Sequence, residues 1–194
     1  MQQKTARAKT LPSHALAKPA APAPAPDAPE GELRHLPGLD YGVLDQLMGY
    51  ALRRAQNALY LHFQRAVAAQ ADVSPQRFAA LVLVAGNPGL RQGVLAEAMG
   101  LHRSGGMRLV DWLHVQGWVR RAPDPLDGRG WTLHPTPAGR AALKRLSESV
   151  QAHDAALVQA VGEGGGQLHR LLERLATAAA AAPEPAPLSS SPPP

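Results

Sequence analysis

The stretch from Gly89 to Pro135 constrains the fold of this chain most, because its glycines and apolar spacing predict two short helices in succession. One helix is expected over residues 92–99, and Gly100 breaks it. A second is expected over residues 104–116, followed by Gly117 at the position where a glycine in the left-handed conformation commonly ends a helix. The expected arrangement is a helix-turn-helix.

Two strands are expected next, over residues 118–121 and 131–134, joined by a loop rich in Pro, Asp and Gly. A basic hairpin after a helix-turn-helix is the layout of a winged helix. In that layout the second helix enters a DNA major groove, and the hairpin reaches the neighbouring backbone or minor groove. The expected fold is therefore mainly α with a small β-hairpin.

A long helix is expected before this stretch. It begins at Asp40, a favourable N-cap, and runs over residues 41–70 with a single apolar stripe. The stripe consists of Leu44, Leu47, Met48, Ala51, Leu52, Ala55, Leu59 and Phe63. Ser74 and Pro75 start the next helix as N-cap and N1 residue. The first stripe is longer than a winged-helix core needs, so we expect part of it to pack on a second subunit.

Thr136 and Pro137 repeat the N-cap and N1-proline signal for a helix that continues to Val161. The glycine-rich run 162–166 interrupts it, since glycine costs roughly 1 kcal/mol per residue in a helix interior. Residues 167–181 form the last expected helix, with Leu168, Leu171, Leu172 and Leu175 on one stripe. Because an isolated helix is costly to nucleate, we expect it to pair with the first helix and its mate from another subunit.

The 194 residues suffice for one domain with a sizeable core. We expect that domain to span 37–181, with its DNA-binding part at 73–135. The tails 1–36 and 182–194 are rich in proline and alanine and are expected to be disordered. No apolar run resembles a signal peptide or a membrane span, so a cytoplasmic protein is expected.

Positive charge is concentrated on the winged-helix stretch. The formal net charge is +5. Residues 90–140 contain the basic residues Arg91, Arg103, Arg108, Arg120, Arg121, Arg129 and Arg140, against Glu97, Asp111, Asp124 and Asp127. Over half of the net charge therefore lies there, which suits contact with phosphates. A solvated basic surface explains the charge alone equally well.

Motifs for catalysis or cofactor binding do not appear in the sequence. There is no cysteine for a thiolate site, and the eight histidines lack metal-ligand spacing. Neither a Gly-x-Ser-x-Gly nucleophile motif nor a phosphate-binding Gly-x-x-x-x-Gly-Lys loop is present. The glycine run 162–166 follows no strand and is interpreted as a linker between helices. The sequence therefore predicts no enzyme, no cofactor and no metal.

The second helix of the helix-turn-helix supplies most candidate DNA contacts. Arg103 and Arg108 lie five residues apart, so one is expected on a phosphate and the other on a base edge. Ser104 is assigned either to a phosphate or to a pure N-cap role, and Met107 to the same surface. A solvated helix face is the alternative for the arginines.

The hairpin supplies the remaining candidates. Arg129 lies at its tip, where contact with phosphate or the minor groove is expected. Asp127 is expected to orient an arginine of the wing. Arg120 and Arg121 alternate between faces of the strand, so at most one faces DNA, and Arg121 is assigned that contact.

Several groups of residues in one register resemble the MarR family of bacterial transcription regulators over roughly residues 40–178. They are Asn87 to Leu90, Leu95 to Glu97, Gly100 and Leu101, Arg103 and Ser104, Arg108 to Asp111, Gly117, Val119 to Arg121, Pro123 and Asp124, Asp127-x-Arg129 and Thr136-x-x-Gly139. The resemblance implies a homodimer that binds a pseudo-palindromic operator, as a repressor, and that dimerises through its first and last helices.

The resemblance also implies that a small, often aromatic, anion releases the DNA. Such an effector is expected between the first helix, the second helix and the start of the helix after the hairpin, where Arg54 or His62 meets it. The alternative is that both are surface residues. A winged helix that binds only proteins is the competing function, and it predicts no salt-dependent DNA binding.

The sequence departs from the family pattern at Gly105 and Gly106, near the start of the second helix of the motif. Two interior glycines would cost about 2 kcal/mol relative to alanine. Either Ser104 is the N-cap, so that they fall in the first turn, or the backbone approaches DNA closely there. Trp112 also departs from the pattern, and we expect it to pack in the core, with an exposed interface patch as the alternative.

Overall fold

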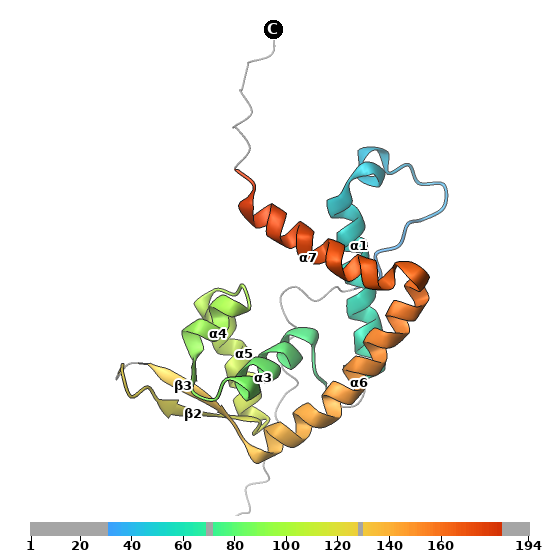
Figure 1. Ribbon diagram of the computed structural model, residues 1–194. Coiled ribbons are helices and arrows are strands. Elements are labelled where there is room, and N and C mark those ends of the chain that lie inside the picture. The colour runs from blue at the N-terminus through green and yellow to red at the C-terminus, as the bar shows by residue number, and fades with distance from the viewer. Residues whose placement is uncertain (1–30, 69–71, 128–129, 184–194) are drawn as a thin grey trace, which may run out of the picture.

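The computed structural model describes residues 31–68, 72–127 and 130–183 and is dominated by helices (Figure 1). In chain order its elements are η1 (Gly42–Gln46), α1 (Met48–Phe63), the π turn η2 (Gln64–Ala68), α3 (Pro75–Gly86), β1 (Leu90–Arg91), α4 (Gln92–Ala98), α5 (Arg103–Val115), β2 (Val119–Pro123), β3 (Trp131–Pro135), α6 (Pro137–Val161), η3 (Gly162–Gly164) and α7 (Gly165–Ala181). The expected fold, mainly helical with a winged helix-turn-helix, is confirmed.

We use "winged lobe" for α3, α4, α5 and the sheet, which gather at one end of α6 (Figure 1). The sheet is antiparallel, with strand order β1-β3-β2. Leu133 of β3 pairs with Leu90 of β1 on one side and with Arg121 of β2 on the other. The predicted hairpin is therefore present. The strand β1 adds an edge strand to the sheet, and its two residues are too few to be recognised as a strand from the sequence.

The core of the winged lobe is apolar and closed to solvent. Its largest fully buried side chains are Leu81, Leu95, Leu113, Leu133, Val67, Val73, Val84, Val110 and Val119. Trp112 joins this core at 7% exposure and meets Trp118 edge to face, which confirms the core role expected for it. The Arg77 guanidinium lies 4.2 Å from the centre of the Trp112 ring, so it fastens α3 to α5 by a cation–π contact.

Two predicted helix starts are confirmed atom by atom. The Ser74 hydroxyl accepts a hydrogen bond from the Arg77 backbone N–H at 3.2 Å, and Pro75 opens α3. The Thr136 hydroxyl accepts one from the Gly139 N–H at 2.9 Å, and α6 follows. Both caps depend on residues within one turn, which is why the sequence alone reveals them.

The predicted start of the first long helix at Asp40 is wrong. Asp40 does accept a hydrogen bond from the Gly42 N–H, at 2.8 Å, but this closes a turn before η1. Gly42 has φ +53, and Leu47 is extended, so the regular helix begins at Met48. At its other end α1 gives way to the π turn instead of continuing to residue 70.

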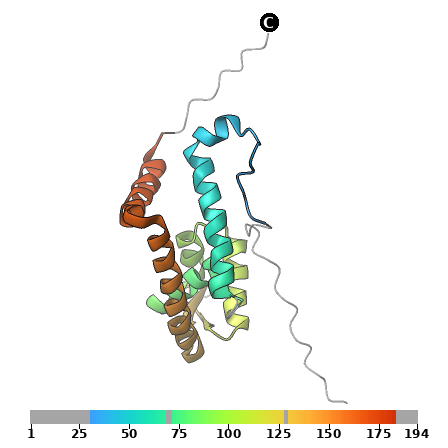
Figure 2. The same ribbon diagram turned by 90° about the vertical axis from the view of Figure 1, so that its right-hand side faces the viewer.

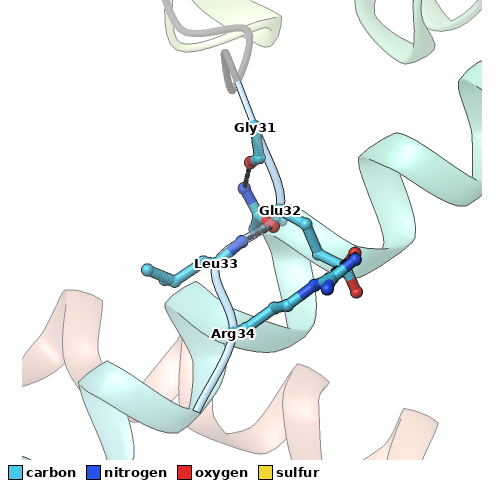
Figure 3. Close-up of polar contacts among 5 residues, drawn as sticks. Gly31, Glu32, Leu33 and Arg34 are labelled. Carbon is cyan, nitrogen blue, oxygen red and sulfur yellow. Dashed lines mark hydrogen bonds and ion pairs between the residues drawn. The ribbon is translucent and has the colours of Figure 1, made fainter. Parts of the chain in front are cut away.

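Residues 31–34, inside the predicted disordered tail, lie beside α1 (Figure 3). The Asn57 side chain donates to the Gly31 carbonyl at 2.9 Å and accepts from the Leu33 N–H at 2.8 Å. Tyr41 adds a second anchor, since its hydroxyl accepts from the Leu36 N–H at 3.0 Å. These contacts involve residues ahead of the predicted domain boundary at residue 37. The rest of the predicted tails, 1–30 and 184–194, lies outside the described residues.

Both views place α1 beside the upper part of α6 and the start of α7, away from the hairpin (Figures 1 and 2). Gly162 ends α6 with φ +75, and a short 3-10 turn leads into α7, so the predicted interruption by glycines is confirmed as a bend. None of the described helices is both long and apolar enough to cross a bilayer.

Candidate nucleic-acid interface

The second helix of the motif, α5, is divided into a buried and an exposed side. Its buried residues are Gly106, Leu109, Val110, Trp112 and Leu113. Its exposed side carries Arg103, Ser104, Met107 and Arg108, all four of the contacts predicted on this helix. Residues four apart lie on the same helix face, so these side chains form one surface. Neither arginine forms an ion pair with any described residue, which leaves both guanidinium groups to solvent.

The start of α5 adds positive character to this surface. His102 is the N-cap and makes no capping hydrogen bond through its side chain, so the pure N-cap alternative for Ser104 is wrong. The first backbone N–H groups of a helix have no partner within it and carry a partial positive charge. Together with Arg103 they favour an anion at this end of α5.

Gly106 is explained by packing between helices. A Cβ placed on it would lie 2.5 Å from the Cβ of Ala96 on α4, a distance that real contacts do not reach. At Gly105 an added Cβ would meet only Leu101, at 3.6 Å, which is an ordinary contact. Close approach of α4 and α5 therefore requires one glycine of the pair, and DNA approach is not needed to account for it.

The hairpin is held to the helix-turn-helix by a buried carboxylate that sequence reasoning missed. Asp124 is 6% exposed, and the Arg91 Nε of β1 lies 2.6 Å from its Oδ2. The Leu126 backbone N–H donates to its other oxygen at 2.9 Å. That hydrogen bond, followed by the charge of Arg91, holds the pKa of Asp124 below its usual range, although burial acts the other way. Arg91 and this loop are far apart in the sequence and come together only in the folded chain, which is why the sequence does not reveal their contact.

The other predicted wing residues are placed as follows. Asp127 is exposed, and its carbonyl accepts from the Gly130 N–H at 2.8 Å. Its predicted role, to orient an arginine of the wing, stays a prediction. Arg129 lies outside the described residues, so its predicted DNA contact also stays a prediction. Arg121 forms an ion pair with Asp111 of α5, which fastens β2 to the helix, whereas Arg120 is exposed. The ion pair is a structural contact of Arg121, and its predicted DNA contact is untested.

The Thr136-x-x-Gly139 motif stabilises the sharp change of direction between β3 and α6. A Cβ on Gly139 would lie 2.0 Å from the Trp118 carbonyl oxygen, so only glycine fits. The Thr136 hydroxyl donates to the Gly117 carbonyl at 2.6 Å while it caps α6. This corner sets where α6 leaves the winged lobe and holds the end of α5 to the hairpin.

Comparison with known proteins identifies the family. The family model described as MarR family matches residues 71–130. A protein of Thauera aromatica, assigned to the hcr operon as a transcriptional regulatory protein, is 35% identical over 138 residues, which cover 71% of this chain and 83% of the relative. The chain belongs to the MarR family. It is a transcription regulator, as its relatives are, and not an enzyme.

Solved structures of MarR-family proteins agree with this assignment. The repressor CouR bound to a 23-mer DNA duplex superposes with a TM-score of 0.66 at 34% identity, covering 73% of this chain and 98% of CouR. CouR bound to p-coumaroyl-CoA gives 0.62 at 33% identity, with 73% and 97% covered. PcaV of Streptomyces coelicolor with its natural ligand gives 0.65 at 27% identity, with 73% and 99% covered.

The two effector candidates of this MarR-family chain, Arg54 and His62, both lie on α1 and are half-buried. The Arg54 Nε is enclosed and has no hydrogen-bond partner among the described residues. His62 is engaged with His153 of α6, Nδ1 to Nδ1, at 2.7 Å. The sequence does not reveal His153 as its partner, because it lies 91 residues away and no local pattern marks it.

A separate shallow groove of about 480 Å³ runs between α3 and α6. It is lined by Val82, Ala85, Gly86, Arg140, Leu143 and Lys144, and so contains neither effector candidate. Among residues 31–68, 72–127 and 130–183 no group of three or more His, Asp or Glu side chains is arranged to hold a metal ion.

Proposed function

We propose that this protein is a cytoplasmic, homodimeric repressor that binds a pseudo-palindromic operator and is released by a small aromatic or anionic ligand. The observation that carries the proposal is the exposed basic side of α5. Its two arginines form no ion pair with a described acid, and the N-terminal end of the helix carries a partial positive charge. The DNA-bound CouR structure, similar over 98% of its length, supports the same use of this fold.

In this proposal α5 enters the major groove, where Arg103, Ser104, Met107 and Arg108 meet phosphates and base edges. Arg129, which the sequence predicts at the tip of the hairpin, reaches the adjacent backbone or minor groove, and Arg121, in the middle of β2, is the second proposed DNA contact of the hairpin. Asp124 holds the hairpin loop to β1 through Arg91 and so supports the position of the wing.

Binding of genomic fragments, followed by footprinting, tests this function. The proposal expects a protected site with two related half-sites about one helical turn apart. It also expects an affinity that falls steeply with salt, because each phosphate contact releases counterions. Absence of salt-dependent DNA binding would favour the alternative, a winged helix that binds only proteins.

The dimer is supported by apolar side chains that the described chain leaves exposed on η1, α1 and α7. They are Val43, Leu44, Leu47, Met48, Leu168, Leu171 and Leu172, each at least 40% exposed. Several large apolar side chains left exposed at one end of a molecule are typical of an interaction site. A second copy of the chain, packed along α1 and α7, would cover it and would set two winged lobes side by side.

The ligand class is supported by two relatives. One was solved with p-coumaroyl-CoA and one with its natural ligand. In this chain the proposed contacts are Arg54 and His62. The Arg54 Nε, which has no partner among the described residues, is a donor that an anion would satisfy.

Anisotropy of labelled operator DNA, titrated with p-coumaroyl-CoA, p-coumarate and benzoate, tests release. The proposal expects at least one of these to dissociate the complex, and expects Arg54→Ala to need more of it. Tyr50→Phe, a change on the same helix that leaves the charge intact, is the matched control. No release by any compound of a broad aromatic panel would contradict this part of the proposal.

A further inference from the structure

His62 of α1 and His153 of α6 face each other where the two helices come together, and we call them the histidine pair. Their Nδ1 atoms are 2.7 Å apart. Their ring centroids are 4.7 Å apart, and the ring planes are inclined by 26°, so the imidazoles are also stacked. Phe63, a core residue, meets the His153 ring edge-on at 5.6 Å.

A hydrogen bond from Nδ1 to Nδ1 depends on the number of protons that the pair holds. One ring must donate an N–H, and the other must accept through a lone pair. The bond therefore survives with both rings neutral, or with one ring charged and the other still accepting. When both rings are charged, each Nδ1 carries a proton. The bond then breaks, and two positive charges repel each other at close range.

The surroundings of the histidine pair oppose the second proton. Burial, and then the neighbouring His62, lower the pKa of His153, while Asp154 acts in the opposite direction. The other charged groups on α1, η2 and α6 are Arg53, Arg54, Arg65, Arg140, Lys144, Arg145 and Glu148, so positive charge predominates on these elements. Asp154 is exposed, so solvent screens the one nearby charge that favours the proton.

Because of where the histidine pair lies, its protonation state affects how α1 and α6 are held together. Just beyond His62, Phe63 and Val67 enter the core of the winged lobe. On α6, Leu146 and Val150 pack on that same core, one to two turns before His153. The pair thus lies at the junction from which α1 and α6 leave the lobe, and its hydrogen bond ties the two helices together at that point.

We propose that the histidine pair is a pH-operated connection between α1 and α6, closed at neutral pH and opened by its second protonation in mildly acidic solution. Opening loosens α1 from α6 while the core of the winged lobe stays packed. The inference does not depend on DNA binding, because neither histidine lies on the exposed side of α5.

The direction of the effect on stability follows from proton linkage. A histidine whose pKa is lower in the folded chain binds its proton more weakly there than in the unfolded chain. Its contribution to stability is therefore complete above the unfolded pKa of about 6.5 and disappears as pH falls below that value towards the folded pKa. Because the two rings are coupled, the two protonation steps belong to the pair and not to either residue.

Thermal unfolding from about pH 8 to about pH 5, with the three variants His153→Phe, His62→Phe and His169→Phe, tests the proposal. Phenylalanine keeps a ring in the stack and removes the titration. The native protein is expected to lose melting temperature on acidification, and both pair variants are expected to lose less. His169, an exposed histidine of α7, is the matched control and should leave the pH dependence as in the native protein.

Two further measurements on the native chain keep the proposal testable if a variant fails to fold. In ¹⁵N spectra, the protonation step that leaves both rings of the pair charged should occur at a lower pH than the protonation of His169. Protection factors for amide hydrogen exchange, which correct for the slower intrinsic exchange in acid, should fall in α1 and α6 on acidification before they fall in α5. The proposal is overturned if His62 and His153 titrate independently at the ordinary value, or if His153→Phe and His62→Phe keep the native pH dependence.

Discussion

Asp124 is the residue on which the geometry of the wing depends, because its buried carboxylate receives Arg91 and the Leu126 N–H together. Asp124→Asn removes the charge, so we expect a lower melting temperature and weaker operator binding at neutral pH. Since the native pKa is lowered, this contribution is present above about pH 4 and disappears as pH falls through the native pKa. Melting curves of native and variant protein should therefore converge in acid.

The matched control for Asp124 is Asp127→Asn in the same loop. Asp127 is exposed, so its substitution should change the melting temperature less. An equal or larger decrease for Asp127→Asn would show that the sequence-based assignment of the orienting role to Asp127 was the correct one.

We expect Arg103 and Arg108 to divide the two tasks predicted for α5, contact with a phosphate and contact with a base edge. Alanine at the residue that reads a base should cost about 1–3 kcal/mol on the operator and little on random DNA. Alanine at the one that binds phosphate should weaken both DNAs and shallow the log–log salt slope by about 0.9 for each phosphate that the variant no longer neutralises. Salt titrations on both DNAs measure this, with Arg53→Ala, an exposed arginine of α1, as control. Native affinity in both α5 variants would exclude this surface.

At the scale of elements, the close packing of α4 against α5 depends on Gly106. Gly106→Ala should destabilise the protein by about 1–3 kcal/mol, because its Cβ overlaps Ala96 and the helices must separate. Gly105→Ala is the matched control, and it should be neutral or stabilising by up to about 1 kcal/mol through helix propensity. Chemical denaturation measures both. Equal behaviour of the two alanine variants would contradict the packing explanation.

Elements were predictable from the sequence where their signals are local. Ser74 and Thr136 cap helices through bonds to residues three positions on, so α3 and α6 begin where expected. Asp40 carries the same kind of signal, but Gly42 adopts a positive φ and diverts the chain into a turn. A single-residue cap cannot reveal that the next residues leave the helical region.

The parts of the candidate site that could not be predicted depend on contacts between distant segments. Arg91 reaches Asp124 only because β1 lies beside β3, and β1 is too short to leave a pattern. His153 acquires its partner from α1 in the same way. By contrast, the exposed residues of α5 follow from helical periodicity alone, and the sequence places all four predicted ones correctly on one surface.

At the scale of the whole molecule, most of the exposed large apolar side chains lie outside the winged lobe, towards the end opposite the hairpin, although Leu126 and Trp131 of the hairpin are exposed too. The exposed leucines of η1 and α7 lie beyond the core of the winged lobe, and both views place α1 and α7 together there (Figures 1 and 2). Burying a leucine fully stabilises by about 1.5–3 kcal/mol, and covering the part of Leu44, Leu168, Leu171 and Leu172 that is still exposed would contribute a corresponding fraction of that to a dimer. A dimer of this kind would present two copies of α5 to one DNA duplex.

Leu171→Asp and Leu44→Asp test that arrangement, because each places a charge where the proposed interface excludes water. Light scattering after gel filtration should show a dimer for the native chain and a shift towards the monomer for both variants at micromolar concentration. Val115→Asp, on an apolar residue 70% exposed at the end of α5, should leave the mass unchanged. Operator affinity should fall with dimerisation, since a monomer occupies only one half-site. A monomeric mass for the native protein would remove the proposed interface and, with it, the need for a palindromic operator.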